Sequence, residues 1–152
     1  MNHVFVIDAS VAVKWLVYEE FTDRAQALLR DSRQILRPLL GPPLLASEVV
    51  NAIYKKLRIE QSITDDEADQ ALTEFFSWPA VQLYAPPGLY QRAFSFARTN
   101  NLPRAYDSQY VALAEMLQAE FWTDDRNLIR AIQGVAPWVR WIGDYPLGDT
   151  IS

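Results

Sequence analysis

Cysteine is absent from this chain of 152 residues, and His3 is the single histidine. Without thiols, the chain cannot form disulfides, thiolate zinc sites, iron–sulfur clusters or a cysteine nucleophile. One histidine beside the first residues cannot build a multi-histidine metal site, and a serine–histidine–aspartate mechanism would depend on it alone. The chemistry therefore has to come from carboxylates, hydroxyls, amides and basic side chains.

Long apolar runs are also absent, because no stretch approaches the roughly 18 to 20 residues that span a bilayer. The first residues pass directly into a short apolar run without a basic leader, so we expect a cytoplasmic protein with no membrane partner. Lys and Arg total 14 against 19 Asp and Glu, which gives a net charge of -5. This charge should repel nucleic acid in general, so a polyanionic substrate would need metal cations or a local basic patch.

Half of the residues are apolar, and they fall into alternating strand-like and helix-like segments. Residues 4–7 (VFVI) form an uninterrupted apolar run, which is typical of a strand buried on both faces of a parallel sheet. Further strands are expected at residues 34–37, 81–84, 121–123 and 139–142. The pattern predicts an α/β fold: one domain over residues 1–152, with a central, mostly parallel sheet of about five strands flanked by helices. No internal repeat or linker divides the chain.

The helices have clearer signals than the strands. Thr64 and Glu67 have the spacing of a capping box, which predicts a helix that Pro79 stops. Ser10 and Thr22 are placed to cap two earlier helices. Other helices are expected after the Pro42–Pro43 pair and over residues 89–98, 106–118 and 128–132.

Three acids directly follow predicted strands. In open α/β sheets, ligands bind beyond the carboxyl ends of the strands, and Asp8, Asp124 and Asp125 occupy such positions. Each of them could instead cap the helix that follows it. Since Asp124 and Asp125 are adjacent, at least one of the pair is expected to point to solvent.

Two further acids lie in predicted helices, where a surface position is the default. Glu48 shares helical spacing with Leu45 and Ala52, so it leans toward the packed face, and Asn51 lies on the same side. Asp107 is in the first turn of its helix, where the macrodipole stabilises a negative charge. A structural role therefore explains Asp107 as well as a functional one does.

Four segments match the motifs of a known family in order and spacing: residues 6–10 (VIDAS), 47–52 (SEVVNA), 105–115 (AYDSQYVALAE) and 122–128 (WTDDRNL). Together they resemble the PIN domain ribonucleases, and specifically the VapC-type toxins of prokaryotic toxin–antitoxin pairs. The resemblance extends from residue 4 to about residue 142. It implies a Rossmann-like sheet with a cluster of acids at its carboxyl edge.

The resemblance also implies which acids serve as catalytic residues and metal ligands: Asp8, Glu48, Asp107 and Asp125. The family's Thr-x-Asp pattern selects Asp125 over Asp124. Four carboxylates cannot all stay ionised together in a cleft without cations, and Mg²⁺ or Mn²⁺ prefer oxygen ligands. The positions that match supporting polar residues of the family are Ser10, Asn51 and Thr123. Basic residues near the motifs that could steer RNA are Lys14, Arg104 and Arg126.

The activity that the resemblance implies is hydrolysis of RNA phosphodiester bonds, with a carboxylate-bound ion activating water and with 5′-phosphate and 3′-hydroxyl products. It also implies a cognate antitoxin and a second copy of the chain as partners. One alternative is a catalytically silent PIN-like module that binds protein or RNA. Another is a Mg²⁺-dependent phosphoryl-transfer domain, but haloacid-type phosphatases need an Asp where this chain has Ser10, and receiver domains need one near Tyr84.

Overall fold

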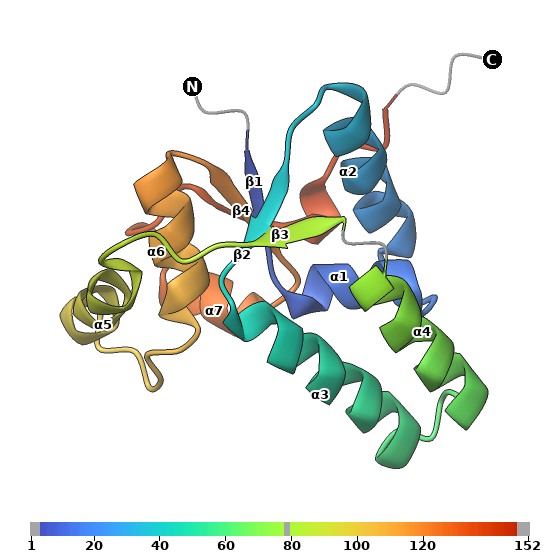
Figure 1. Ribbon diagram of the computed structural model, residues 1–152. Helices are drawn as coiled ribbons and strands as arrows, with labels where there is room; N and C mark the ends of the chain where they lie inside the picture. Colours follow the sequence, from blue (N-terminus) through green and yellow to red (C-terminus); the bar gives the residue numbers. More distant parts are fainter. Residues whose placement is uncertain (1–3, 78–79, 149–152) are drawn as a thin grey trace.

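The structure is a computed structural model, and it describes residues 4–77 and 80–148. At its centre lies a five-stranded sheet with the order β3-β2-β1-β4-β5, in which every pairing is parallel (Figure 1). The strands are β1 (Phe5–Ile7), β2 (Leu39–Gly41), β3 (Val81–Leu83), β4 (Glu120–Thr123) and β5 (Val139–Trp141). The strand order reverses between β1 and β4, and such a switch point is where open α/β sheets bind ligands. The predicted α/β fold with a parallel five-stranded sheet is confirmed.

Helices cover both faces of this sheet. They are α1 (Ala9–Leu16), α2 (Thr22–Gln34), α3 (Leu44–Arg58), α4 (Asp65–Ser77), α5 (Leu89–Thr99), α6 (Ser108–Leu117) and α7 (Arg126–Ala131). In Figure 1, α1, α2 and α4 lie to one side of the strands, while α5 and α6 lie to the other. Helices α3 and α4 form a hairpin that projects past the carboxyl ends of the strands. None of the helices in the described part of the chain is long and apolar enough to cross a membrane.

The core is centred on β1, because both faces of that strand are covered. Val6 and Ile7 are fully buried, as is Phe121 of the neighbouring β4. Tyr110 of α6 stacks on Phe121 with ring centroids 5.4 Å apart. Each buried side chain of this size stabilises the fold by about 1.5–3 kcal/mol, so the central strands are a rigid base for residues at their ends.

The strand predicted at residues 34–37 is wrong. Helix α2 continues to Gln34, and Ile35 and Leu36 are exposed, with Leu36 in a left-handed conformation (φ 53°). The second strand instead begins at Leu39, which pairs with Phe5 of β1. Ile35–Leu36 and Leu39–Leu40 are both apolar pairs, and of these four residues only Leu39 is buried in the core.

Two of the predicted helix caps are also different in the structure. Asp8, and not Ser10, caps α1, because its side chain accepts a hydrogen bond from the Val11 backbone N–H. Helix α2 begins after Phe21 in a left-handed conformation (φ 65°), without a side-chain cap. Thr22 instead accepts a hydrogen bond from the Glu19 backbone N–H at 2.9 Å and so fastens the turn before α2.

The predicted capping box of α4 is confirmed. The Glu67 backbone N–H donates to Thr64 Oγ1, and the Thr64 backbone N–H donates to Glu67 Oε1, both at 3.1 Å. The helix-stopping role expected of Pro79 lies outside the described residues. The sequence therefore locates the start of this helix correctly.

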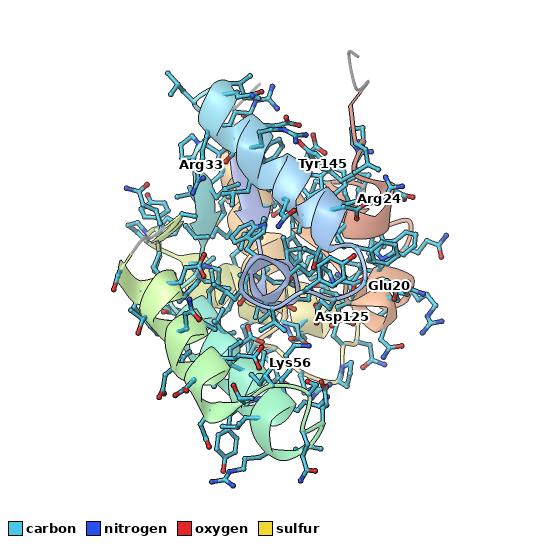
Figure 2. The ribbon with its side chains drawn as sticks, turned by 90° about the vertical axis from the view of Figure 1, so that its right-hand side faces the viewer. Glu20, Arg24, Arg33, Lys56, Asp125 and Tyr145 are labelled. Carbon is cyan, nitrogen blue, oxygen red and sulfur yellow. The ribbon has the colours of Figure 1, made fainter. Side chains whose placement is uncertain are left out.

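Two local contacts fix elements around the sheet. At Gly41 a Cβ atom would lie 2.6 Å from Leu45 Cδ2, so glycine is what lets α3 start close to the end of β2. Near the other end of the chain, the Arg24 guanidinium of α2 donates to the Tyr145 carbonyl oxygen at 2.6 Å, and the two residues lie side by side in Figure 2. These contacts hold α3 and the segment after β5 against the sheet.

Candidate active site

Asp8 lies at the carboxyl end of β1, directly at the switch point. The register pairs Ile7 with Trp122, so the next residues on the two strands, Asp8 and Thr123, are neighbours. Thr123 Oγ1 donates to Asp8 Oδ2 at 2.5 Å, and Ser10 Oγ donates to Asp8 Oδ1 at 2.5 Å. The structure therefore brings the predicted supporting hydroxyls of Ser10 and Thr123 to Asp8. Asp8 is only 9% exposed.

The turn after β4 is fastened to the same hydroxyls. The Asp125 backbone N–H donates to Thr123 Oγ1 at 3.0 Å, and the Asp124 backbone N–H donates to Ser10 Oγ at 2.8 Å. Asp125 also caps α7, because its Oδ1 accepts a hydrogen bond from the Leu128 backbone N–H at 3.0 Å. Like Asp8, Asp125 is a helix cap and a strand-end acid at once, so the two roles that the sequence left open are compatible.

The structure separates the adjacent acids Asp124 and Asp125. Both carboxylate oxygens of Asp124 are engaged elsewhere: Trp141 Nε1 donates to Oδ1 at 2.9 Å, and Lys14 Nζ lies 2.9 Å from Oδ2. Asp125 instead interacts electrostatically with Asp8, Glu48 and Asp107. Asp125 is therefore the member of the pair that faces the other acids.

Glu48 lies in α3, Asp107 directly precedes α6, and α6 also carries a site residue that the sequence reasoning missed, Tyr110. Tyr110 Oη donates to Glu48 Oε1 at 2.5 Å, and Tyr110 is only 2% exposed. The sequence places Tyr110 on the apolar side of its helix, and its ring does pack in the core. The signal for its polar contact is its spacing, because Tyr110 lies three residues after Asp107 and so on the same helix face.

Electrostatics couple the four acids. Burial raises the pKa of Asp8 to about 7, and repulsion from Glu48 and Asp125 adds to this, although the hydrogen bonds from Ser10 and Thr123 oppose it. Burial also raises the pKa of Glu48, with Asp107 and Asp125 contributing in the same direction and the Tyr110 hydroxyl opposing it. The pKa of Asp107 is raised by burial and by Asp125. The cluster is therefore short of positive charge at neutral pH.

The donor set fits a hard divalent cation in type and charge. All four groups are carboxylates, and their mutual repulsion is what a bound Mg²⁺ or Mn²⁺ relieves. Within residues 4–77 and 80–148, however, no three of the acids converge closely enough to form a ready-made cage for an ion. The fit thus rests on donor chemistry and charge rather than on preformed coordination geometry.

Two other predicted site residues are not where the proposed roles need them. Lys14 is only 3% exposed, and its ammonium is held by Glu19 at 3.0 Å and Asp124 at 2.9 Å, so it presents no free cation to RNA. Asn51 is exposed and makes no hydrogen bond to the acids in the part of the chain that the structure describes; it lines a groove beside Phe76 instead. The sequence indicates the helix face on which Lys14 and Asn51 lie, but not the residues that each of them contacts.

The other two basic residues are exposed and near the acids. The positive charge of Arg104 lowers the pKa of Asp107, which opposes part of the effect of burial. Arg126 lies over the Trp141 ring at 4.7 Å and over the Phe21 ring at 5.8 Å. Both guanidinium groups can therefore reach a polyanion at this edge of the sheet.

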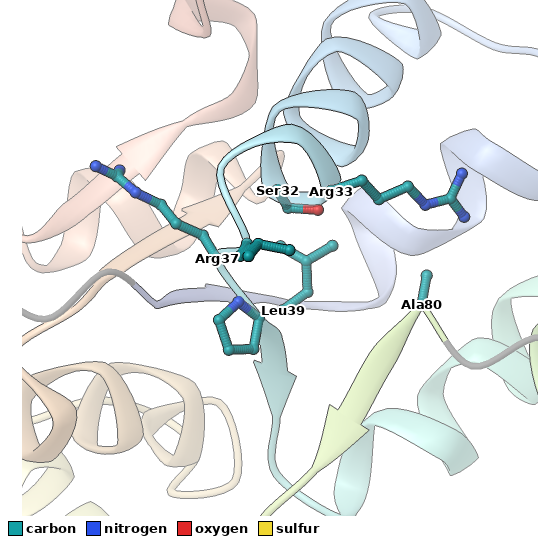
Figure 3. Close-up of a pocket in the computed structure, with 7 residues that line it drawn as sticks. Ser32, Arg33, Arg37, Leu39 and Ala80 are labelled. Carbon is teal, nitrogen blue, oxygen red and sulfur yellow. The ribbon is translucent and has the colours of Figure 1, made fainter.

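One cavity adjoins the acid cluster. It has a volume of about 140 Å³, and Asp107 and Asp125 form part of its wall. A larger hollow of about 560 Å³ is lined by Ser32, Leu39 and neighbouring residues. Figure 3 shows that Arg33 and Arg37 point away from each other there, so this hollow lacks converging polar groups.

Comparison with known proteins identifies the class of protein to which this chain belongs. The structure is similar to the crystal structure of PAE2754 from Pyrobaculum aerophilum, with a TM-score of 0.66 and 19% sequence identity over 92% of this chain and 91% of that one. That likeness supports the PIN-like α/β fold. In sequence, the chain is 31% identical over 124 residues to Ribonuclease VapC3 of Pyrobaculum aerophilum, covering 81% of this chain and 90% of the relative. No family model matches the chain. The chain belongs to the family of VapC-type PIN ribonucleases.

Proposed function

We propose that the protein is a metal-dependent endoribonuclease that hydrolyses RNA phosphodiester bonds, and that it is the toxin of a toxin–antitoxin pair. The observation that carries this proposal is the cluster of Asp8, Glu48, Asp107 and Asp125, which are coupled electrostatically at the switch point of the sheet. The similarity to Ribonuclease VapC3 supports the same chemistry.

In this proposal the four acids hold Mg²⁺ or Mn²⁺. Such an ion, when bound, lowers the pKa of a water molecule and offsets the charge of the scissile phosphate. Ser10 and Thr123 orient Asp8 by their hydrogen bonds, and Tyr110 orients Glu48. The protein thereby presents carboxylates in fixed positions without needing histidine or cysteine.

The protein's own basic residues would bring RNA to an acidic edge. Arg104 comes shortly before Asp107, and Arg126 directly follows Asp125; both are exposed. Their guanidinium groups can pair with phosphates on the flanks of the acid cluster, where they reduce the repulsion of a chain with net charge -5. Neither side chain is buried as Lys14 is, and the ion pair of Arg126 with Glu20, at 3.8 Å, is exposed.

We further propose that the protein acts in the cytoplasm as a homodimer and is held inactive by a cognate antitoxin. Family membership supports these partners. The surface is also compatible with protein contacts, because aromatic side chains are exposed on α5 at Tyr90 and Phe94 and across α3 and α4 at Tyr54 and Phe76. Exposed aromatic residues of this kind are enriched at protein interfaces.

The test is cleavage of a panel of structured and single-stranded RNAs by purified protein, with Mg²⁺, Mn²⁺ or EDTA. We expect cutting that requires the divalent cation and that falls on the order of 100-fold or more in Asp8→Asn, because this variant loses an anionic ligand while keeping its shape. Circular dichroism is the control for folding. Equal cutting by the two proteins would contradict the proposed site, and silence on every RNA would favour a binding module.

A further inference from the structure

The cavity beside the acid cluster combines apolar walls with a polar rim. Its apolar lining comes from Leu102 and Pro103, in the segment before α6, and from Leu128 and Ala131 of α7, and Asp107 and Asp125 also line it. The loop between α5 and α6 lies beside α7 in Figure 1. A group in this cavity would therefore be in direct contact with two of the four acids proposed to act on the phosphate.

The size of the cavity limits what it can hold. Sites for whole drug-sized ligands measure roughly 300–1,000 Å³. At about 140 Å³ this cavity is too small for a nucleotide, but it suits a single flat ring system. Apolar lining residues from two segments of the chain favour the faces of such a ring, because aromatic bases gain free energy when their faces are removed from water.

Asn127 gives the cavity a hydrogen-bonding group. Its Oδ1 accepts a hydrogen bond from Arg130 Nη2 at 2.5 Å, which orients the amide. Within the described residues, its Nδ2 donors have no protein partner and remain available to a ligand. The Arg104 guanidinium, also on the wall, supplies further donors. Donors in these positions match the carbonyl oxygens and ring nitrogens at the edges of nucleobases.

Charge distinguishes a base from other occupants. Four carboxylates that hold one divalent ion still carry net negative charge, so a further phosphate or an acidic side chain inside the cavity, against Asp107 and Asp125, would be repelled; Arg104 is the one basic residue among the described residues that line it. An uncharged heterocycle avoids this repulsion and still uses the donors. The geometry therefore favours a base whose own phosphate lies outside the cavity, over the acid cluster.

We propose that this cavity, the base pocket, receives the base of a nucleotide adjacent to the scissile phosphate and that Asn127 sets the base preference at that position. The inference rests on the proposed ribonuclease function and deepens it by naming where sequence is read. Each hydrogen bond from Asn127 to a preferred base would favour that base by on the order of two- to tenfold over one that cannot accept it.

The test maps cleavage sites in an RNA library with a randomised segment, in Mn²⁺, for wild type and three variants. Asn127→Ala removes the donors, and Ala131→Phe fills the pocket from an exposed position on α7. Gln133→Ala is the matched control, because it removes an exposed amide just beyond α7. Thermal melting checks that all four proteins are folded.

We expect wild type and Gln133→Ala to show the same base bias at one position next to the cut. Asn127→Ala and Ala131→Phe should lose the bias at that position while keeping any bias at other positions. If wild type cuts and both pocket variants keep its full bias, the base pocket is refuted while the nuclease stands. If wild type cuts no RNA, the proposed function fails and the inference fails with it.

Discussion

Asp8 shows how one side chain can be a helix cap and a member of the acid cluster at the same time. It caps α1 through the Val11 backbone N–H, and it lies among three other acids at the end of a buried strand. The position after a buried strand was enough to single out Asp8 from the sequence. The hydroxyl partners across the sheet could not be paired with it until the register of β1 and β4 was known.

The raised pKa of Asp8 makes the stability of the metal-free protein depend on pH. Burial raises this pKa from 3.8 to about 7, so the folded state binds the proton more tightly than the unfolded state does. The stability that Asp8 contributes should therefore be fully present below about pH 4 and be lost as pH rises through 7, a change on the order of 4 kcal/mol. Glu48 and Asp107 act in the same direction.

Urea unfolding in EDTA from pH 4 to pH 8, on wild type and Asp8→Asn, measures this effect. The difference between the two proteins isolates Asp8 from the other titrating groups. The free energy of unfolding of Asp8→Asn should increase relative to that of wild type as pH rises across this range. A difference that does not change with pH would show that Asp8 carries no raised pKa in the fold.

Tyr110 is expected to position Glu48. Tyr110→Phe keeps the ring on Phe121 but removes the donor to Glu48, so the free energy of unfolding should change by only about 1 kcal/mol. Cleavage and apparent Mn²⁺ affinity should each fall about tenfold, because a ligand without its orienting partner binds less well. Rates over a Mn²⁺ titration, with Tyr90→Phe as an exposed control, provide the measurement.

A double variant separates this positioning role from a general effect. In the Glu48→Gln background, Tyr110→Phe should add little further loss, because the group that it orients has already been changed. If the loss of cleavage rate in the double variant equals the product of the two single losses, Tyr110 acts independently of Glu48.

At the scale of elements, a buried ion-pair network ties α1 to two other parts of the site. Lys14 of α1 contacts Glu19 and Asp124, and Lys56 of α3 lies 2.5 Å from the second oxygen of Glu19. The network thus links α1, the turn that carries Asp125, and the helix that carries Glu48. Together with the hydrogen bond from Trp141 Nε1 to Asp124 Oδ1, the network engages both carboxylate oxygens of Asp124 away from the acid cluster.

Lys14→Met tests this network. The variant leaves Asp124 and Glu19 without their buried cation, and since both acids are partly exposed, we expect a loss of about 2 kcal/mol in the free energy of unfolding. The control Lys55→Met changes an exposed residue of α3 and should stay within about 0.5 kcal/mol. Denaturant midpoints that match for the two variants would contradict a structural role for Lys14.

The sequence predicted most helices and the central strands, because their signals are local. The α4 capping box and the apolar run of β1 depend on neighbouring residues alone. The second strand was misplaced, because residues 35–36 and 39–40 are equally apolar and only packing shows which pair is buried. Likewise, the ion pair of Lys14 with Asp124 joins two residues that are far apart in sequence.

At the scale of the whole molecule, the chain gathers acids from four separate segments at one edge of the sheet. The strand order places the ends of β1 and β4 side by side, and α3 and α6 bring Glu48 and Asp107 to the same place. The family resemblance named these four acids from the sequence. Which of them face one another follows only from the assembled fold, as the separation of Asp124 from Asp125 shows.

The most direct test of the account compares RNA cleavage by Asp125→Asn and Asp124→Asn over a range of Mn²⁺ concentrations. The two substitutions have the same chemistry at adjacent positions, and the assay temperature is set where both proteins are folded. The account predicts that Asp125→Asn abolishes cleavage at every Mn²⁺ concentration, while Asp124→Asn retains it. Loss in Asp124→Asn with retention in Asp125→Asn would contradict the assignment of the acid cluster.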